Sequence, residues 1–182
     1  LIDNNPHVPD RTEAIFGHGP DPGPVLASMA RGLADSGAHF LTMPCNTGHV
    51  FKEAIREAVD IPFIDMIEET VRVLSEKNVG LLATSGTLRT GLYEAACNSR
   101  DIELIIPSKA DQELVMDIIR RVKAGGTGAS VRNHTAGIVA RLADSGAEAV
   151  IAGCTEISLI SGTDMSIPWI DALDCLVDAA MN

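Results

Sequence analysis

Apolar residues along this chain fall alternately into helical spacing and short continuous runs. Apolar positions 26, 29, 30 and 33 have the spacing of a helix with one buried face, and the run 40–43 that follows is typical of a buried parallel strand. The same succession recurs to the end of the chain, which predicts an α/β fold with parallel sheets. The predicted helices cover 24–36, 50–59, 67–75, 111–124, 131–145 and 172–181. A further predicted helix is capped by Thr87 and runs to residue 99. The predicted strands cover 40–43, 61–64, 79–84, 102–106 and 148–152.

One segment occurs twice. LADSGAHFLTMPCNT at 33–47 and LADSGAEAVIAGCTE at 142–156 share their first six residues, and Cys45 and Cys154 hold the same position in the two copies. IPFID, ending at residue 65, is answered by IPWID, ending at residue 171. Two matched blocks in the same order indicate two copies of one supersecondary unit. The sequence therefore predicts two lobes with approximate internal symmetry, whose Cys turns face each other.

The repeat also predicts where the lobes begin and end. The helix after IPFID leads into the second lobe, so the equivalent helix 172–181 is expected to cross back onto the first. This assigns 1–66 plus 172–182 to the first lobe and 67–171 to the second. Residues 1–11 read as the end of a strand and a loop, because two Asn and two Pro favour turns. The second copy starts near Asn78, well ahead of its LADSGA, so a strand and a helix are expected to be missing from the N-terminus of the first.

Composition and charge narrow the possible partners. The 182 residues are 46% apolar, enough for a normal core, but only 3% aromatic, so the core is built mainly from aliphatic side chains. A net charge of −11 argues against nucleic acids and anionic membranes as partners, because both need clustered Lys and Arg.

No apolar run is long enough to span a bilayer and no signal peptide is visible. Four Cys are too few for a disulfide scaffold, which predicts a cytoplasmic setting.

The two Cys turns carry the candidate chemistry. Cys45 and Cys154 each follow a predicted strand and precede a helix, the position where ligands bind in parallel sheets. The helix N-terminus is expected to lower the pKa of each thiol below about 8.5. Two thiols on opposite sides of a carbon with a labile hydrogen can remove a proton from one face and return one to the other, which inverts the carbon without a metal or cofactor. Asn46, Thr47 and Thr155 are expected to hydrogen-bond a carboxylate held over the helix termini.

Other interpretations of the cysteines remain open at this point. Cys45 and His49 are spaced as a feasible metal-ligand pair, although Cys154 has no His nearby. A disulfide between Cys45 and Cys154 is possible and would silence the proposed chemistry. Cys97 and Cys175 lie in predicted helices among apolar neighbours, so they are interpreted as small hydrophobic residues.

The sequence alone does not decide the roles of four polar residues. His49 either caps its helix or supports the site from behind the residues that touch the ligand. Lys123 is by default a favourable charge at a helix C-terminus, and Arg11 a solvated loop residue. Glu156, next to Thr155, is a candidate capping carboxylate.

Several segments resemble the aspartate/glutamate racemase superfamily, and most of all the cofactor-independent aspartate racemases. The matching segments run in the family's order through nearly the whole chain. They are NNP and PDR within 4–11, PCNTGH at 44–49, IEET at 67–70, LLATSGT at 81–87, VKAG at 122–125 and GCTE at 153–156. The family's opening strand and glycine-rich turn have no counterpart ahead of residue 1.

The resemblance implies two flavodoxin-like lobes with the active site in the cleft, independence from pyridoxal phosphate, and a homodimer. It implies that Cys45 and Cys154 are the catalytic pair, and that Arg11 and Lys123 engage the side-chain carboxylate of the substrate or tune the thiols. Asn46, Thr47, Thr87 and Thr155 match hydrogen-bonding positions for the substrate. His49 matches the family's motif without an assigned role. We predict that His49 and Glu156 support the site from behind these residues.

The predicted function is therefore racemisation of a small acidic amino acid, aspartate first and glutamate second, by two thiols. Hydantoin racemases and single-Cys decarboxylases or isomerases are the alternatives within the superfamily, and the presence of both Cys disfavours the single-Cys enzymes. From other classes, the alternatives are a catalytically silent dicarboxylate-binding protein and a zinc-binding structural module.

Overall fold

The structure, a computed structural model, describes residues 1–160 and 165–182; residues 161–164, inside the predicted second lobe, lie outside the described part. Helices and strands alternate along the chain as the sequence pattern predicts. In chain order the elements are α1 (Arg11–Ile15), α2 (Gly23–Asp35), β1 (Leu41–Thr42), the 3₁₀ helix η1 (Thr47–Phe51), α3 (Lys52–Arg56), β2 (Phe63–Ile64), α4 (Met66–Arg72), β3 (Asn78–Ala83), α5 (Ser85–Thr90), α6 (Leu92–Asn98), β4 (Glu103–Ile105), α7 (Lys109–Lys123), α8 (Ala129–Asp144), β5 (Ala149–Gly153), α9 (Thr155–Ser158), β6 (Trp169–Asp171) and α10 (Ala172–Met181).

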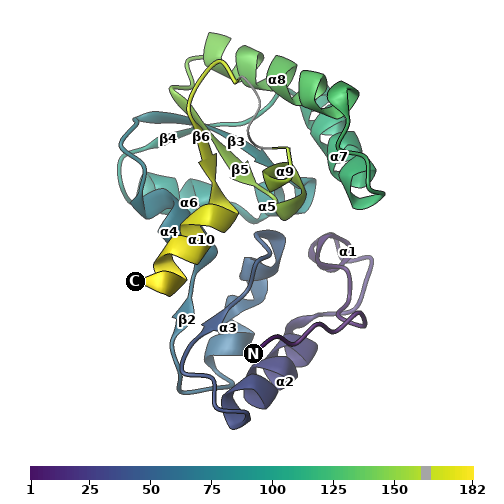
Figure 1. Ribbon diagram of the computed structural model, residues 1–182, viewed down its shortest axis with the longest axis vertical. Coiled ribbons are helices and arrows are strands. Elements are labelled where there is room, and N and C mark those ends of the chain that lie inside the picture. The colour runs from purple at the N-terminus through teal and green to yellow at the C-terminus, as the bar shows by residue number, and fades with distance from the viewer. Residues whose placement is uncertain (161–164) are drawn as a thin grey trace.

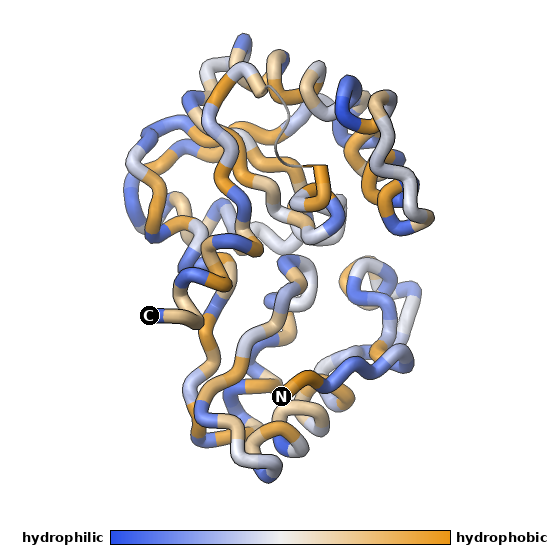
Figure 2. The backbone as a smooth tube through the Cα atoms, in the orientation of Figure 1, coloured by the Kyte–Doolittle hydropathy of each residue, from blue (hydrophilic) through white to orange (hydrophobic). Residues whose placement is uncertain are grey.

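The larger sheet has four parallel strands in the order β4-β3-β5-β6, with helices on both faces (Figure 1). Alternate residues of β3 enter different cores. Leu81 packs with residues of α4 and α6, whereas Leu82 packs with residues of α7 and α8. Because both faces are covered, the central strands are hydrophobic along their length, which Figure 2 shows for β3 and β5.

The smaller sheet lies below the larger one in Figure 1 and consists of β1 and β2. The two strands are parallel, with Leu41 opposite Phe63. Leu26 and Ala30 of α2 and Ile55 of α3 bury Leu41 in a separate hydrophobic cluster. The fold is therefore mixed α/β with parallel sheets in two lobes, as predicted.

The repeated LADSGA sequence forms the same structure twice. It ends α2 in the first copy and α8 in the second, and the glycine that follows each helix has a left-handed backbone, with φ +91° at Gly37 and +101° at Gly146. The N–H of each glycine donates to a carbonyl three residues back, at 2.9 Å in both copies. Only glycine adopts this conformation without strain, which explains why the motif stops both helices.

Two helix N-termini meet where the lobes join. Asp65 caps α4 and Asp171 caps α10, and each carboxylate accepts the N–H group two residues further on at 2.9 Å. The two helices pack against each other through Met66, Ala172 and Leu176, all of them buried (Figure 1). The second echo in the sequence, IPFID and IPWID, thus marks a matched pair of strand–cap–helix junctions.

Three expectations about local structure are wrong. Residues 1–5 do not end a strand, since the structure assigns them no strand. Among the described residues, the sheet of the first lobe contains only β1 and β2. The helix expected over 50–59 starts earlier, as η1, and its α-helical part ends at Arg56. The helix expected after Thr87 is capped by Thr84, whose hydroxyl accepts the Thr87 N–H at 3.0 Å, and it is divided at Gly91, where φ is +66°.

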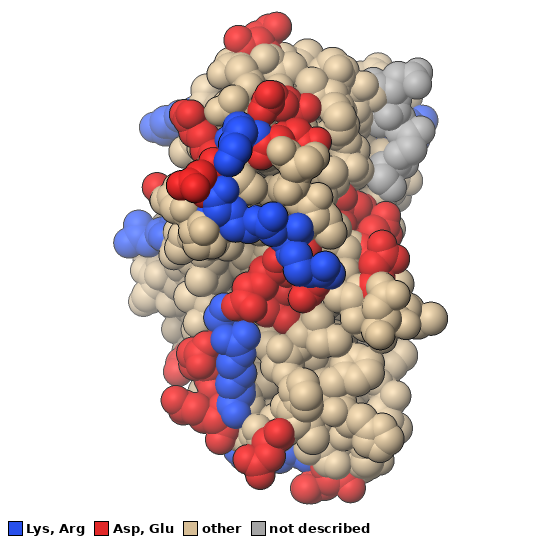
Figure 3. Space-filling model, turned by 90° about the vertical axis from the view of Figure 1, so that its left-hand side faces the viewer, with Lys and Arg blue, Asp and Glu red and all other residues tan. Residues whose placement is uncertain are grey.

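Opposite charges are interleaved on the surface. On the face shown in Figure 3, Lys and Arg side chains lie beside Asp and Glu side chains. Ion pairs also join oppositely charged neighbours, for example Arg121 Nε with Asp117 Oδ2 at 2.7 Å.

Across residues 1–160 and 165–182, no helix combines the length and the apolar character needed to cross a bilayer.

Asp65 is the most strongly held of the capping carboxylates. Its side chain is 1% exposed, and Lys52 Nζ lies 2.6 Å from its Oδ2. Burial acts to raise the pKa of Asp65, but the hydrogen bond from Lys52, the positive charges nearby and the backbone N–H of Glu68 outweigh burial and hold that pKa below its ordinary value.

Replacing Asp65 by Asn should lower the free energy of unfolding at pH 7 by about 1.5–3 kcal/mol, because the amide keeps the cap but loses the charge opposite Lys52. A carboxylate whose pKa is lowered by folding stabilises fully above its unfolded-state pKa of about 4, and this stabilisation is lost as the pH falls through the folded-state pKa. The gap between wild type and Asp65→Asn should therefore shrink below about pH 4. Urea unfolding followed by circular dichroism between pH 7 and pH 3 measures this gap.

The matched control is Asp171→Asn, since Asp171 caps the equivalent helix but bonds to the Ser158 hydroxyl instead of a Lys. This variant should lose less stability than Asp65→Asn at pH 7. A gap for Asp65→Asn that stays constant down to pH 3 would contradict the assigned electrostatic role.

Candidate active site

A cavity of about 140 Å³ lies between the lobes, at the carboxyl ends of their strands. Its volume is well below the roughly 300–1,000 Å³ typical of sites for drug-sized ligands, so it fits a ligand the size of an amino acid. Its lining consists of Asp10, Arg11, Thr12, Pro44, Cys45, Asn46, Thr47, Thr84, Lys123, Cys154, Thr155 and Glu156.

Sheet topology places the cavity. In the larger sheet the connections after β3 and β5 run in opposite directions, because β4 lies beside β3 on one side and β6 beside β5 on the other. Loops diverge at such a reversal and leave a crevice at the carboxyl ends of the strands. Thr84 follows β3 and Cys154 follows β5, so both residues line this crevice.

The structure brings the two repeat cysteines to one cavity from separate lobes. Cys45 follows β1 and is half-buried, whereas Cys154 follows β5 and is 7% exposed. Both are free thiols rather than a disulfide. Cys97 lies on α6 and is fully buried in the core, where burial raises the pKa of its thiol to about 11, which agrees with its interpretation as a small hydrophobic residue.

Cys154 is held in its protonated form. Its Sγ lies 2.9 Å from Glu156 Oε2 and donates a hydrogen bond to it. Burial raises the pKa of Cys154, and the Glu156 carboxylate raises it further, well above the ordinary range for a thiol. The expectation that the helix N-terminus lowers this pKa is wrong for Cys154, because α9 is only four residues long and a carboxylate lies beside the sulfur.

Two basic side chains line the same cavity. Arg11 begins α1, and its Nη1 donates to the Pro9 carbonyl at 3.2 Å; no carboxylate lies within ion-pair distance of it among residues 1–160 and 165–182. Lys123 ends α7, and its Nζ lies 3.8 Å from Glu156 Oε1. Both are therefore placed to attract an anion into a protein whose overall charge repels one.

Thr87 is not in the lining, although it was expected to contact the substrate. It is 1% exposed, and its Oγ1 lies 2.9 Å from Thr47 Oγ1 and 3.0 Å from Thr84 Oγ1. Thr47 and Thr84 are also 2.9 Å apart, so the three hydroxyls form one cluster that joins the Cys45 turn to the second lobe. Thr87 braces the cavity wall from behind.

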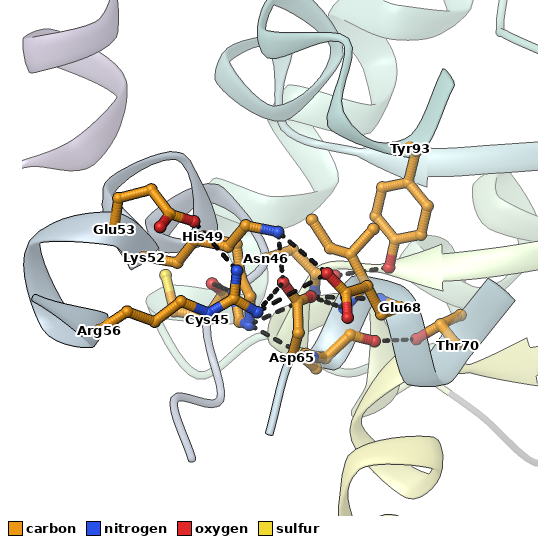
Figure 4. A network of polar contacts seen from close by, with 12 residues as sticks. Cys45, Asn46, His49, Lys52, Glu53, Arg56, Asp65, Glu68, Thr70 and Tyr93 are labelled. Atoms are coloured by element: carbon orange, nitrogen blue, oxygen red, sulfur yellow. Dashed lines mark hydrogen bonds and ion pairs between the residues drawn. The ribbon is translucent and has the colours of Figure 1, made fainter. Parts of the chain in front are cut away.

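Asn46 is tied across the lobes as well. Tyr93 Oη on α6 donates to Asn46 Oδ1 at 2.6 Å (Figure 4). Asn46 is 2% exposed, and its Nδ2 has no hydrogen-bond partner in the described part of the chain. Since a buried donor left unpaired costs about 1–3 kcal/mol, this amide is a candidate for pairing with a ligand.

His49 is completely buried and is not part of the cavity lining. Figure 4 shows it in the polar network beside Cys45 and Asp65. Its Nε2 accepts the Met66 N–H at 3.0 Å, so the proton is on Nδ1, which donates to the Cys45 carbonyl at 2.8 Å. Burial lowers the pKa of His49, which keeps the ring neutral. Both nitrogens are occupied, so His49 has no lone pair for a metal, and the described residues contain no cluster of three or more metal-ligating side chains.

The second cysteine turn has a matching support. Ser158, four residues after Cys154, donates to Asp171 Oδ1 at 2.6 Å. His49, four residues after Cys45, binds the first N–H of the helix that Asp65 caps. The fourth residue of each turn is thus tied to the start of α4 or α10.

The structure adds four lining residues that the sequence did not single out as site residues. Glu156, expected behind the site, reaches the lining as well. Thr84 belongs to the motif that ends β3, and its position after a buried strand was the available signal. The four additional lining residues are Asp10, Thr12, Pro44 and Thr84.

Replacing Glu156 by Gln should speed alkylation of Cys154. Removing the carboxylate takes away a negative charge that disfavours the thiolate, so the pKa of Cys154 should fall although burial still raises it. Iodoacetamide labelling at pH 8, quantified by mass spectrometry for each Cys, measures the rate. Cys97 is the internal control, because its labelling rate should stay the same. A Cys154 rate that is unchanged or lower in Glu156→Gln would show that the carboxylate does not hold the thiol proton.

Known proteins provide an independent comparison. The sequence profile of the family described as Asp/Glu/Hydantoin racemase matches residues 1–180. The broad specificity amino-acid racemase RacX of Bacillus subtilis strain 168 is 26% identical over 156 residues, which are 82% of this chain and 66% of RacX. A glutamate racemase of Corynebacterium kroppenstedtii strain DSM 44385 is 27% identical over 165 residues, which are 86% of this chain and 56% of that enzyme.

Among solved structures, the aspartate racemase of Picrophilus torridus has a TM-score of 0.85 and 28% sequence identity, and the match covers 100% of this chain and 79% of that one. The chain spans less than two thirds of the length of both curated relatives. The family profile nevertheless covers almost every residue. The chain belongs to the Asp/Glu/Hydantoin racemase family.

Proposed function

We propose that the protein racemises a small acidic amino acid, aspartate first and glutamate second, by proton transfer at Cα between Cys45 and Cys154. The observation that carries the proposal is the convergence of two thiols, one from each lobe, on a single cavity of amino-acid size. The names of the relatives support the same reaction: an aspartate racemase, a glutamate racemase and an amino-acid racemase of broad specificity.

The proton steps follow from the different surroundings of the two thiols. Cys154 rests as the thiol, because burial and Glu156 favour its protonated form. Cys45, as the thiolate, removes the Cα proton, and the electron pair of the C–H bond remains on the substrate. Cys154 then gives its proton to the opposite face of Cα, which leaves the inverted amino acid, a Cys45 thiol and a Cys154 thiolate. The same steps run backwards for the other enantiomer, so the thiols provide both the acid and the base without a cofactor.

Substrate binding needs positive charge and hydrogen-bond donors. Arg11 and Lys123 meet the side-chain carboxylate of the substrate, which explains how an acidic ligand binds a chain of net charge −11. Asn46, Thr47 and Thr155 supply hydrogen bonds from the turns that carry the thiols. The homodimer, the cytoplasmic setting and the lobe boundaries at 66/67 and 171/172 stay predictions.

Replacing either Cys45 or Cys154 by Ala should reduce conversion of L-aspartate to D-aspartate by about 10²–10⁴-fold, the usual contribution of a positioned acid or base. Chiral chromatography of the reaction mixture measures the conversion. Cys175→Ala, a half-buried Cys outside the cavity lining, is the control and should keep wild-type activity. Full racemisation by either single variant would rule out the two-thiol scheme. Binding of L-aspartate by the wild type without conversion would instead support a silent dicarboxylate-binding protein.

Arg11→Ala and Lys123→Ala should each raise KM for L-aspartate by about tenfold, since each removes one charge-assisted contact with the side-chain carboxylate. KM for a neutral amino acid such as L-alanine should change much less. Steady-state kinetics with both substrates measure the difference. Arg120→Ala, on the same helix as Lys123 but outside the cavity lining, should alter neither value. Equal effects on acidic and neutral substrates would show that the two cations do not read the side chain.

A further inference from the structure

One hydrogen bond links the core of the second lobe to the residue beside Cys45. Tyr93 lies on α6 and is 1% exposed, and its Oη donates to Asn46 Oδ1 at 2.6 Å (Figure 4). Asn46 directly follows Cys45 and lines the cavity. The bond therefore joins a side chain outside the lining of this cavity to one within it.

The amide of Asn46 has one acceptor atom and one donor group, so a partner on the oxygen determines which end remains for other partners. Tyr93 occupies the oxygen. The nitrogen, in contrast, is buried and has no partner in residues 1–160 and 165–182. An acidic substrate offers only acceptor oxygens at its carboxylates, and these match the unused N–H groups of Asn46.

We propose that Tyr93 is a positioning residue, which holds the Asn46 amide with Nδ2 available to donate to a carboxylate of the substrate. The inference rests on the proposed function, because it assumes an acidic ligand in the cavity. Tyr93 acts through Asn46 and does not line the cavity itself. Burial raises the pKa of Tyr93, so the phenol stays protonated and remains a donor at neutral pH.

The competing explanation is that Tyr93 only fills the core. Its ring packs among Ile67, Val71 and Leu81 in the hydrophobic cluster between the larger sheet, α4 and α6. Tyr93→Phe separates the two roles, because it keeps the ring and removes only the hydroxyl. Without that donor the Asn46 amide is free to turn, and the substrate loses a fixed hydrogen-bond partner.

The first experiment measures kcat and KM for L-aspartate in wild type, Tyr93→Phe, Asn46→Ala and the double variant. Tyr93→Phe should raise KM by about 3–10-fold, the factor for one hydrogen bond, with a smaller change in kcat. In the Asn46→Ala background the same substitution should have no further effect. Thr135→Val is the matched control, since it removes another fully buried hydroxyl, which donates to the Val131 carbonyl in α8, and it should leave KM unchanged. Independent, additive effects of Tyr93→Phe and Asn46→Ala would overturn the inference.

A second readout does not depend on turnover. Titration of ¹⁵N-labelled protein with succinate should shift the Asn46 side-chain amide signals, assigned by their loss in Asn46→Ala, and Tyr93→Phe should weaken this shift. If succinate shifts the Asn46 signals, Tyr93→Phe weakens that shift, and the protein does not racemise aspartate, the role of Tyr93 is sustained while the proposed function fails. If the protein racemises aspartate and Tyr93→Phe changes neither KM nor the shift, the proposed function is sustained while the role of Tyr93 fails. Neither racemisation nor a shift in the wild type would overturn both.

Discussion

The site depends on two capping carboxylates at the junction of the lobes. Asp65 and Asp171 begin helices α4 and α10, which pack against each other, and each cap is also close to the fourth residue after a repeat cysteine. His49 reaches the first N–H of α4, and Ser158 donates to Asp171. Because buried polar groups are costly to leave unpaired, these bonds fix the direction in which each cysteine turn leaves its strand. The two turns face one cavity since the two helix starts are held together.

The scaffold around the two cysteine turns is repeated, but the surroundings of the two sulfurs differ. Glu156 stands two residues after Cys154, and its Oε2 accepts a hydrogen bond from the Cys154 sulfur at 2.9 Å, whereas the Cys45 sulfur lies beside Gly48. A carboxylate beside one thiol therefore makes the two sulfurs chemically different within a duplicated fold, and in the proposed reaction it favours Cys154 as the proton donor.

Features set by local sequence were predictable, and those set by contacts between lobes were not. The positions of Cys45 and Cys154 at equivalent strand ends follow from the repeat and the alternation of apolar runs. Thr87 was predicted to cap its helix and contact the substrate, yet Thr84 is the cap, and a hydroxyl cluster with the first lobe removes Thr87 from the lining. Sequence also predicted a lowered pKa for Cys154, because a helix N-terminus is visible in a sequence but the direction of the Glu156 side chain is not.

The most direct test of the two-thiol account is the isotope found at Cα during the first turnovers in deuterated water. L-Aspartate would be incubated with the wild-type protein, and the two enantiomers separated and weighed by mass spectrometry while conversion is still small. Because the proton-donating thiol exchanges with solvent, the account predicts D-aspartate with one deuterium at Cα and recovered L-aspartate without any. D-Aspartate that keeps its original hydrogen would show that a single base serves both faces, and deuterium in L-aspartate without formation of the D-enantiomer would show that the proton returns to the face it left; either result would contradict the account.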